Sequence, residues 1–156
     1  MKNTLKIAGF LIACLIVCGP LVSCSSNDDP TSETVIAYDQ LPQSSKSFIS
    51  AYYYSTAVTK VERDNDNGII TYEVTLANGH EVTFNSDGEW VEIDAPDGES
   101  IPFEVIPPAI GDYLNANYQG YGVNDITRTG FGYEVELVTG VDLLFDSQGN
   151  FIRIDH

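Results

Sequence analysis

Apolar and polar residues alternate along two stretches of the chain, residues 70–76 and 131–137. Their apolar positions are Ile70, Tyr72, Val74, Leu76, Phe131, Tyr133, Val135 and Leu137. The residues between them are mostly polar or charged, so each stretch predicts a strand with one face toward the core. One apolar and one polar face is typical of an antiparallel sheet that is covered on one side only.

A helical period precedes each of these strands. The expected inward positions are Ser45, Phe48, Ile49, Tyr52 and Tyr53 in the first segment, and Ile110, Tyr113, Leu114, Asn117 and Tyr118 in the second. This spacing places each set on one stripe of a helix. Pro42 and Pro107 suit the first helical position, where the missing N–H costs nothing.

Residues 41–94 and 106–155 carry the same pattern: the segment 72–76 recurs as 133–137, and Trp90 recurs as Phe151. A repeat of this period predicts two copies of one supersecondary unit. The expected fold class is therefore α+β, a tandem repeat of a helix followed by a four-stranded antiparallel sheet, with the helix packed on one sheet face. The expected boundaries are a first repeat at 39–94, a connector at 95–105 and a second repeat at 106–156. The two copies share a core or extend one sheet.

Residues 1–23 have the pattern of a signal peptide. Lys2 and Lys6 precede a twelve-residue apolar run, residues 7–18, which is shorter than the about 20 residues that a spanning helix needs. The sequence Leu21-Val22-Ser23-Cys24 resembles the bacterial lipoprotein processing box, which implies cleavage before Cys24 and lipidation of its thiol. The alternative is an ordinary secretory signal that is cut nearby.

Residues 24–38 are mainly polar and lack an apolar period, which predicts a disordered tether. Within this tether, the segment 26–29, Ser-Asn-Asp-Asp, resembles the acidic signal that directs Bacteroidetes lipoproteins to the cell surface. A generic linker is the alternative reading. The expected location is the outer membrane, with the domain facing either the cell surface or the periplasm.

The chain is strongly acidic, with 23 Asp and Glu against 7 Lys and Arg and a formal net charge of −16. This balance argues against nucleic acid as a partner, because such binding depends on Lys and Arg that neutralise phosphates. It is compatible with a basic peptide or protein partner, or with divalent cations. It is equally typical of a secreted protein that avoids association through its charge.

The repeat behind a lipoprotein signal resembles the PepSY-like family of small secreted Bacteroidetes proteins, whose fold is similar to that of the β-lactamase inhibitory protein. The residues that carry the resemblance in the first copy are Leu41-Pro42, Phe48-Ile49, Tyr72-Glu73-Val74, Gly79, Val82, Phe84, Asp87-Gly88 and Trp90. Related domains act as modules that inhibit peptidases. These are core and turn positions, so the resemblance implies a fold and carries no inhibitory residue over.

Catalytic signals are weak, and we expect neither an enzyme nor a cofactor. His80 and His156 are the two histidines, and the three cysteines lie at positions 14, 18 and 24, where none remains as a free thiol after processing. No phosphate-binding glycine loop or zinc-ligand spacing is found in the sequence.

The outward face of the predicted sheet is the candidate binding site. Its expected members are Glu73, Thr75, Glu81, Thr83, Glu134, Glu136, Asp142 and Leu144. Concentrated carboxylates favour a basic peptide or protein loop, although an ordinary solvated face has the same composition. The sequence thus favours a membrane-anchored, non-enzymatic binding module; an envelope structural or adhesive lipoprotein is the alternative, and the sequence leaves the oligomeric state open.

Asp64 and Asp66 form a weak candidate for calcium. The segment 64–68, Asp-Asn-Asp-Asn-Gly, offers alternating oxygen ligands of the kind that calcium prefers, but it lacks the bidentate Glu of the helix–loop–helix site. The same residue types are what a hairpin turn requires. A calcium-responsive module is therefore a further alternative.

Overall fold

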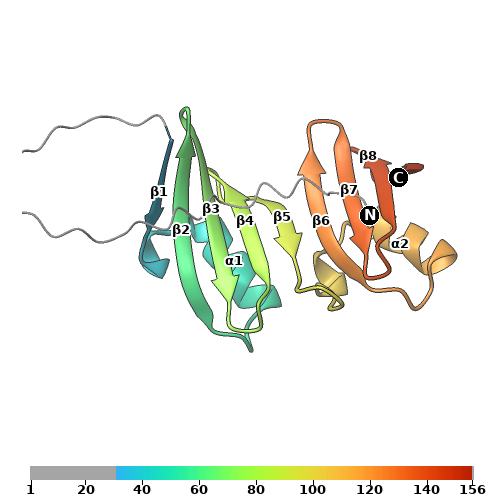
Figure 1. Cartoon of the computed structure of the whole chain (residues 1–156), viewed down its shortest axis with the longest axis horizontal. Helices are drawn as coiled ribbons and strands as arrows, with labels where there is room; N and C mark the ends of the chain where they lie inside the picture. Colours follow the sequence, from blue (N-terminus) through green and yellow to red (C-terminus); the bar gives the residue numbers. More distant parts are fainter. Residues whose placement is uncertain (1–30, 156) are drawn as a thin grey trace, which may run out of the picture.

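The computed structural model describes residues 31–155 (Figure 1). In chain order its elements are β1 (Thr31–Val35), η1 (Tyr38–Gln40), α1 (Gln43–Tyr52), β2 (Val58–Asp66), β3 (Ile69–Leu76), β4 (Glu81–Asn85), β5 (Trp90–Asp94), η2 (Phe103–Val105), α2 (Pro108–Asn117), β6 (Val123–Thr129), β7 (Gly132–Leu137), β8 (Asp142–Asp146) and β9 (Phe151–Asp155). The predicted signal peptide and Cys24 lie outside the described residues.

All nine described strands form one antiparallel sheet in the order of the chain, from β1 at one edge to β9 at the other. The predicted fold class, a tandem repeat of a helix and a four-stranded sheet, is therefore wrong. The finding that overturns it is a single nine-stranded sheet with two α-helices, in which 44% of the described residues are strand and 21% are helical. The sheet is continuous because β5 pairs directly with β6 through three residue pairs.

One face of the sheet carries an unbroken row of apolar side chains, which we call the core row. From β2 to β9 its members, paired strand to strand, are Val61, Val74, Val82, Ile93, Ile126, Val135, Leu143 and Ile154. The first seven are at most 3% exposed. Because side chains alternate between the faces of a strand, the residues directly before and after each member of the core row point to the opposite face of the sheet.

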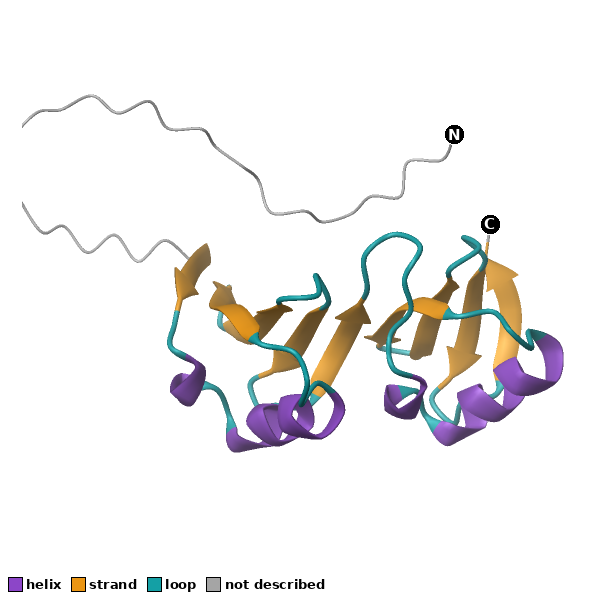
Figure 2. Cartoon of the chain, turned by 90° about the horizontal axis from the view of Figure 1, so that it is seen from below, coloured by secondary structure: helices purple, strands orange, loops and turns teal. Residues whose placement is uncertain are grey.

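Both helices lie on the face that carries the core row (Figure 2). Phe48 of α1 packs edge-on against Phe84 with ring centroids 5.7 Å apart. Tyr113 of α2 packs edge-on against Phe145 at 5.4 Å and stacks on Phe151 at 4.6 Å. The helices thus remove the apolar face from water, which is the main stabilising contribution in such a layer.

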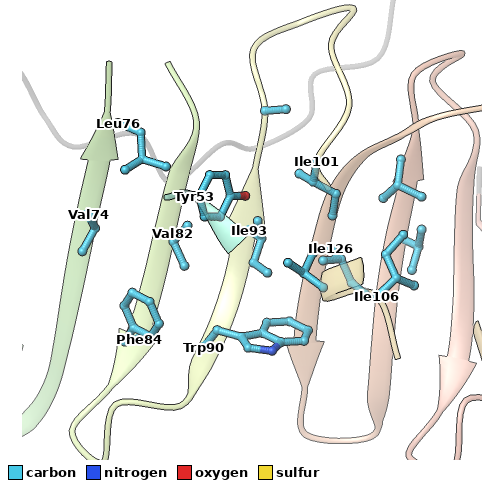
Figure 3. Packing of buried hydrophobic residues seen from close by; sticks show 14 of the residues in the cluster. Tyr53, Val74, Leu76, Val82, Phe84, Trp90, Ile93, Ile101, Ile106 and Ile126 are labelled. Carbon is cyan, nitrogen blue, oxygen red and sulfur yellow. The ribbon is translucent and has the colours of Figure 1, made fainter. Parts of the chain in front are cut away.

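The pairing of β5 with β6, which we call the seam, joins the two parts of the core. Ile93 faces Ile126 across it, and both are fully buried (Figure 3). The buried Asn124 of β6 holds the connector beside the seam: its Nδ2 lies 2.9–3.1 Å from the carbonyl oxygens of Ala95, Pro96 and Glu99. These bonds satisfy backbone acceptors of a loop that carries little regular structure of its own.

Several further expectations differ from the structure. Tyr52 and Asn117, expected on the inward stripes of the helices, are exposed. Part of the predicted tether is ordered, because Thr31–Val35 pairs with β2 as an edge strand; residues 24–30 lie outside the described range. Phe131, predicted to point inward, is 90% exposed because the chain reverses between β6 and β7 at this residue. Over residues 31–155, neither helix is long and apolar enough to cross a membrane.

Candidate functional site

The face of the sheet opposite the helices carries two unbroken rows of mainly acidic side chains, which together we call the acidic face. From β2 to β9 the first row is Glu62, Glu73, Thr83, Glu92, Thr127, Glu134, Leu144 and Arg153. The second row is Lys60, Thr75, Glu81, Asp94, Asp125, Glu136, Asp142 and Asp155. The rows hold ten carboxylates against two basic side chains.

The eight residues predicted from the sequence all lie in these rows. Those of the first copy are on β3 and β4, and those of the second copy are on β7 and β8. The centre of the face was not predicted: there β5 and β6 place Glu92, Asp94, Asp125 and Thr127 side by side. The alternation of apolar and polar residues around Ile93 and Ile126 could have predicted that these four polar side chains point away from the core. The pairing of β5 with β6, which brings the four together, was not predicted.

Asp125 occupies the least solvated position at this centre. Burial raises its pKa to about 7, and the negative charges of Glu92, Asp94 and Glu136 act in the same direction. The Thr127 hydroxyl donates to Oδ1 at 3.2 Å and opposes the shift. The other oxygen, Oδ2, is buried and has no hydrogen-bond partner among the described residues. The carboxyl group therefore keeps one acceptor that the surrounding strands leave unsatisfied.

Neighbouring glutamates also have raised pKa values, because of burial and of nearby negative charges. Burial raises the pKa of Glu73, with Glu81 and Glu62 as the next contributions. Loss of solvent around the Glu92 carboxylate raises its pKa as well, followed by Asp94 and Glu81. Like charges that face each other across a strand pair are unfavourable, so a positive charge placed over the face would relieve a cost that the fold already carries.

We expect Asp125→Asn to stabilise the protein above pH 7. A folded-state pKa above the unfolded value of 3.8 means that the folded protein holds a proton more tightly, so stability is lost as the pH rises toward 7. A tenfold difference in proton affinity corresponds to about 1.4 kcal/mol. Allowing for the partial exposure of the group, the variant should gain on the order of 2 kcal/mol at pH 8 and little at pH 4.

Urea denaturation at several pH values measures this difference. Asp112→Asn makes the same chemical change on an exposed position of α2. It is the matched control and should change the stability by less than about 0.5 kcal/mol. The His80 pKa is lowered by burial and makes stability fall on acidification below about 6.5, but this contribution is common to all three proteins. Equal stability of the parent and Asp125→Asn at pH 8 would contradict the assignment.

The weak calcium candidates are placed differently from the sequence prediction. Asp64 and Asp66 lie within β2, which continues through the segment expected to be a turn, and the chain reverses at Asn67-Gly68. Asn67 and Gly68 both have positive φ, as a two-residue hairpin of this type requires. Oδ1 of Asp66 accepts a hydrogen bond from Asn67 at 2.7 Å. Within residues 31–155, no group of three or more His, Cys, Asp or Glu side chains is arranged to hold a metal ion.

Three solved structures from Bacteroides are similar to this chain. One, from Bacteroides vulgatus, is described as a periplasmic protein of unknown function; it is 35% identical, with a TM-score of 0.75, and the match covers 80% of this chain and 100% of that one. Another, from Bacteroides thetaiotaomicron, is described as a "putative calcium-regulated periplasmic protein"; it is 34% identical, with a TM-score of 0.74, covering 80% and 97%.

A third structure, also from Bacteroides vulgatus, is described as a periplasmic protein of the DUF2874 family and is 32% identical, with a TM-score of 0.74, covering 83% and 99% of the two chains. No curated protein matches this chain. The family model described as "Putative beta-lactamase-inhibitor-like, PepSY-like" matches residues 30–71 and 70–153. The chain therefore belongs to the PepSY-like family.

Proposed function

We propose that this protein is a non-enzymatic binding module of the cell envelope, which captures a basic segment of a peptide or protein on its acidic face. The observation that carries the proposal is the pair of acidic rows, which cross eight strands without interruption and face away from both helices. The family description, inhibitor-like, is consistent with a role exerted through binding.

The electrostatics of the face favour a cationic partner in two ways. A continuous negative surface steers a positive chain toward it and raises the association rate at low salt. Burial, and after it the neighbouring negative charges, raise the pKa values of Glu73, Glu92 and Asp125. On contact, a Lys or Arg side chain placed over these groups offsets the part that comes from like-charge repulsion. A rigid, hydrogen-bonded sheet presents these charges without an ordering cost at the moment of binding.

The proposed location follows from the N-terminal pattern and from the similar structures. Three of these are described as periplasmic, and the box that ends at Cys24 supports a lipid anchor. We place the domain at the outer membrane, tethered through Cys24 by the residues that precede β1. The chain enters β1 at an edge of the sheet, beside Asp66 of β2.

Charge reversal at Glu73 and Glu134 tests the proposal. Both residues lie in the first row, on β3 and β7. We expect Glu73→Lys with Glu134→Lys to weaken binding of a fluorescent octapeptide of alternating Lys and Gly about tenfold or more at low salt, because roughly 1.4 kcal/mol of lost attraction is one decade in affinity. Fluorescence anisotropy measures the affinity, and thermal denaturation checks that the fold is retained.

The matched control is Glu104→Lys with Asp112→Lys, which makes the same change in net charge at exposed positions near and on α2. This control should bind within about twofold of the parent, because its charges are far from the two rows and screened by salt. Equal weakening in both double variants would show attraction to net charge alone. Failure of the parent to bind the peptide at low salt would refute the proposal.

A calcium-responsive module is the second candidate. It is favoured by the description of the Bacteroides thetaiotaomicron structure as calcium-regulated and by the acidic composition of the face, since calcium prefers carboxylate oxygens. Calorimetric titration with millimolar calcium tests this candidate, and the absence of a binding heat would rule it out. If calcium binds on the acidic face, it should also compete with the basic peptide.

A further inference from the structure

The core row ends abruptly at the free edge of β9. Seven of its members are at most 3% exposed, whereas Ile154, the last, is 39% exposed. Ile93 of β5 is a member of the core row that has a neighbouring strand on both sides. It is fully buried because Ile126 of β6 pairs with it across the seam. Among the strands of residues 31–155, β9 pairs with β8 on one side only, and its other side is a template for a further strand.

The two edges of the sheet differ in chemistry, and they lie at opposite ends of its long axis (Figure 1). The edge strand β1 is polar apart from Val35. The edge strand β9 begins with two apolar residues and alternates apolar and charged residues only from Ile152 onward. Arg153 and Asp155 lie in the rows of the acidic face, and Ile154 lies between them on the core side. The edge of β9 is therefore the one where a further strand would bury apolar surface.

We propose that β9 pairs with β9 of a second copy of this chain, antiparallel and centred on Ile154. This register sets Ile154 against Ile154 of the other copy, which extends the core row. It also sets Arg153 of each copy against Asp155 of the other, so both flanking pairs have opposite charges. A two-fold interface of this kind is self-complementary and closes at the dimer.

Other registers fit less well. Shifting the pairing by one residue would turn one copy over relative to the other and place an isoleucine in the row of charges. Pairing β9 with β1 of another copy would form an open chain of subunits and leave Ile154 against a polar strand. By comparison, the seam joins only three residue pairs and sets Asp94 opposite Asp125, whereas the self-pairing of β9 sets arginine opposite aspartate. The contact is small, so the dimer is weak and its population rises with protein concentration. The lipid anchor of the proposed function would raise that concentration locally.

Cysteine cross-linking tests the register in the full chain. Across the two-fold axis the Cα atoms of residue 154 would be about 4.5–5.5 Å apart, within disulfide range. Those of residue 153 would be offset by two residues, about 8 Å apart, beyond the roughly 7 Å that a disulfide spans. Ile154→Cys should therefore form disulfide-linked dimers at least about fivefold faster than Arg153→Cys. The parent chain, which has cysteines at 14, 18 and 24, sets the background.

Charge exchange provides a second measurement that does not depend on cysteine. Arg153→Asp and Asp155→Arg each place like charges across the two-fold axis, so each variant alone should associate less than the parent in sedimentation velocity. Mixed together they place opposite charges in both flanking pairs, and association should return to the parent level. The intrachain pair of Arg153 and Asp155, 2.6 Å apart, is lost in both variants and cannot explain a recovery on mixing. Equal dimer yields from the two cysteine variants, or no recovery in the mixture, would overturn the proposal.

Discussion

Replacement of Phe84 by alanine will lower the free energy of unfolding by about 3–5 kcal/mol, the usual cost of removing a buried aromatic ring. Phe84 lies on β4, is completely buried and packs against Phe48 of α1. It thus joins the helical layer to the sheet. Its loss leaves a cavity between two layers that close only partly around it.

Urea denaturation at constant pH gives the free energy of unfolding, and Phe131→Ala is the matched control. Phe131 is 90% exposed in the hairpin between β6 and β7, so the same chemical change should cost less than about 0.5 kcal/mol there. A loss in Phe84→Ala that is as small as the loss in Phe131→Ala would mean that the helix does not depend on Phe84 for its attachment.

Gly132→Ala will destabilise the protein by on the order of 3 kcal/mol or more, because its backbone conformation and its close neighbours both exclude a side chain. Gly132 has φ of 153°, a conformation that residues with a Cβ rarely adopt. A Cβ at this position would also collide with the carbonyl of Phe145 and lie 2.8 Å from Cα of Asp146. Both obstacles belong to the backbone of β8, so relief requires separation of β7 from β8.

Gly130→Ala, two residues earlier in the same hairpin, is the control for Gly132→Ala. An added Cβ there meets no atom within 4 Å, and the residue does not have positive φ, so the change should cost less than about 1 kcal/mol and can stabilise through the unfolded state. Thermal denaturation followed by circular dichroism measures both. A Gly132→Ala protein as stable as the parent would show that the β7–β8 pairing at this point is not tight.

Local alternation was enough to predict which residues share a face, because a strand directs successive side chains to opposite sides. Val74 and Val135 were expected in the core and are fully buried, and the eight candidate residues of the acidic face were assigned to the correct side of their strands. The prediction that Phe131 points inward was wrong, because the alternating pattern continues into a turn. The chain reverses there, and the alternation rule no longer applies.

The global arrangement could not be predicted by the same means. β1 contains a single apolar residue, Val35, so its strand is defined by pairing with β2 rather than by composition. The seam joins residues on either side of a long connector, and nothing in Trp90–Asp94 or Val123–Thr129 specifies that these two strands are neighbours. For this reason the fold class was wrong, and the centre of the acidic face around Asp125 was missed.

Strand alternation also has a consequence for how the family diversifies. Each strand from β2 to β9 devotes one residue to the core row and its neighbours to the opposite surface. Under the proposed function, substitutions that change the ligand preference fall on the acidic face, whereas substitutions that affect packing fall on the core row. Point mutations can therefore change the residues of the acidic face while the residues of the core row stay the same. In this way one scaffold can acquire new targets.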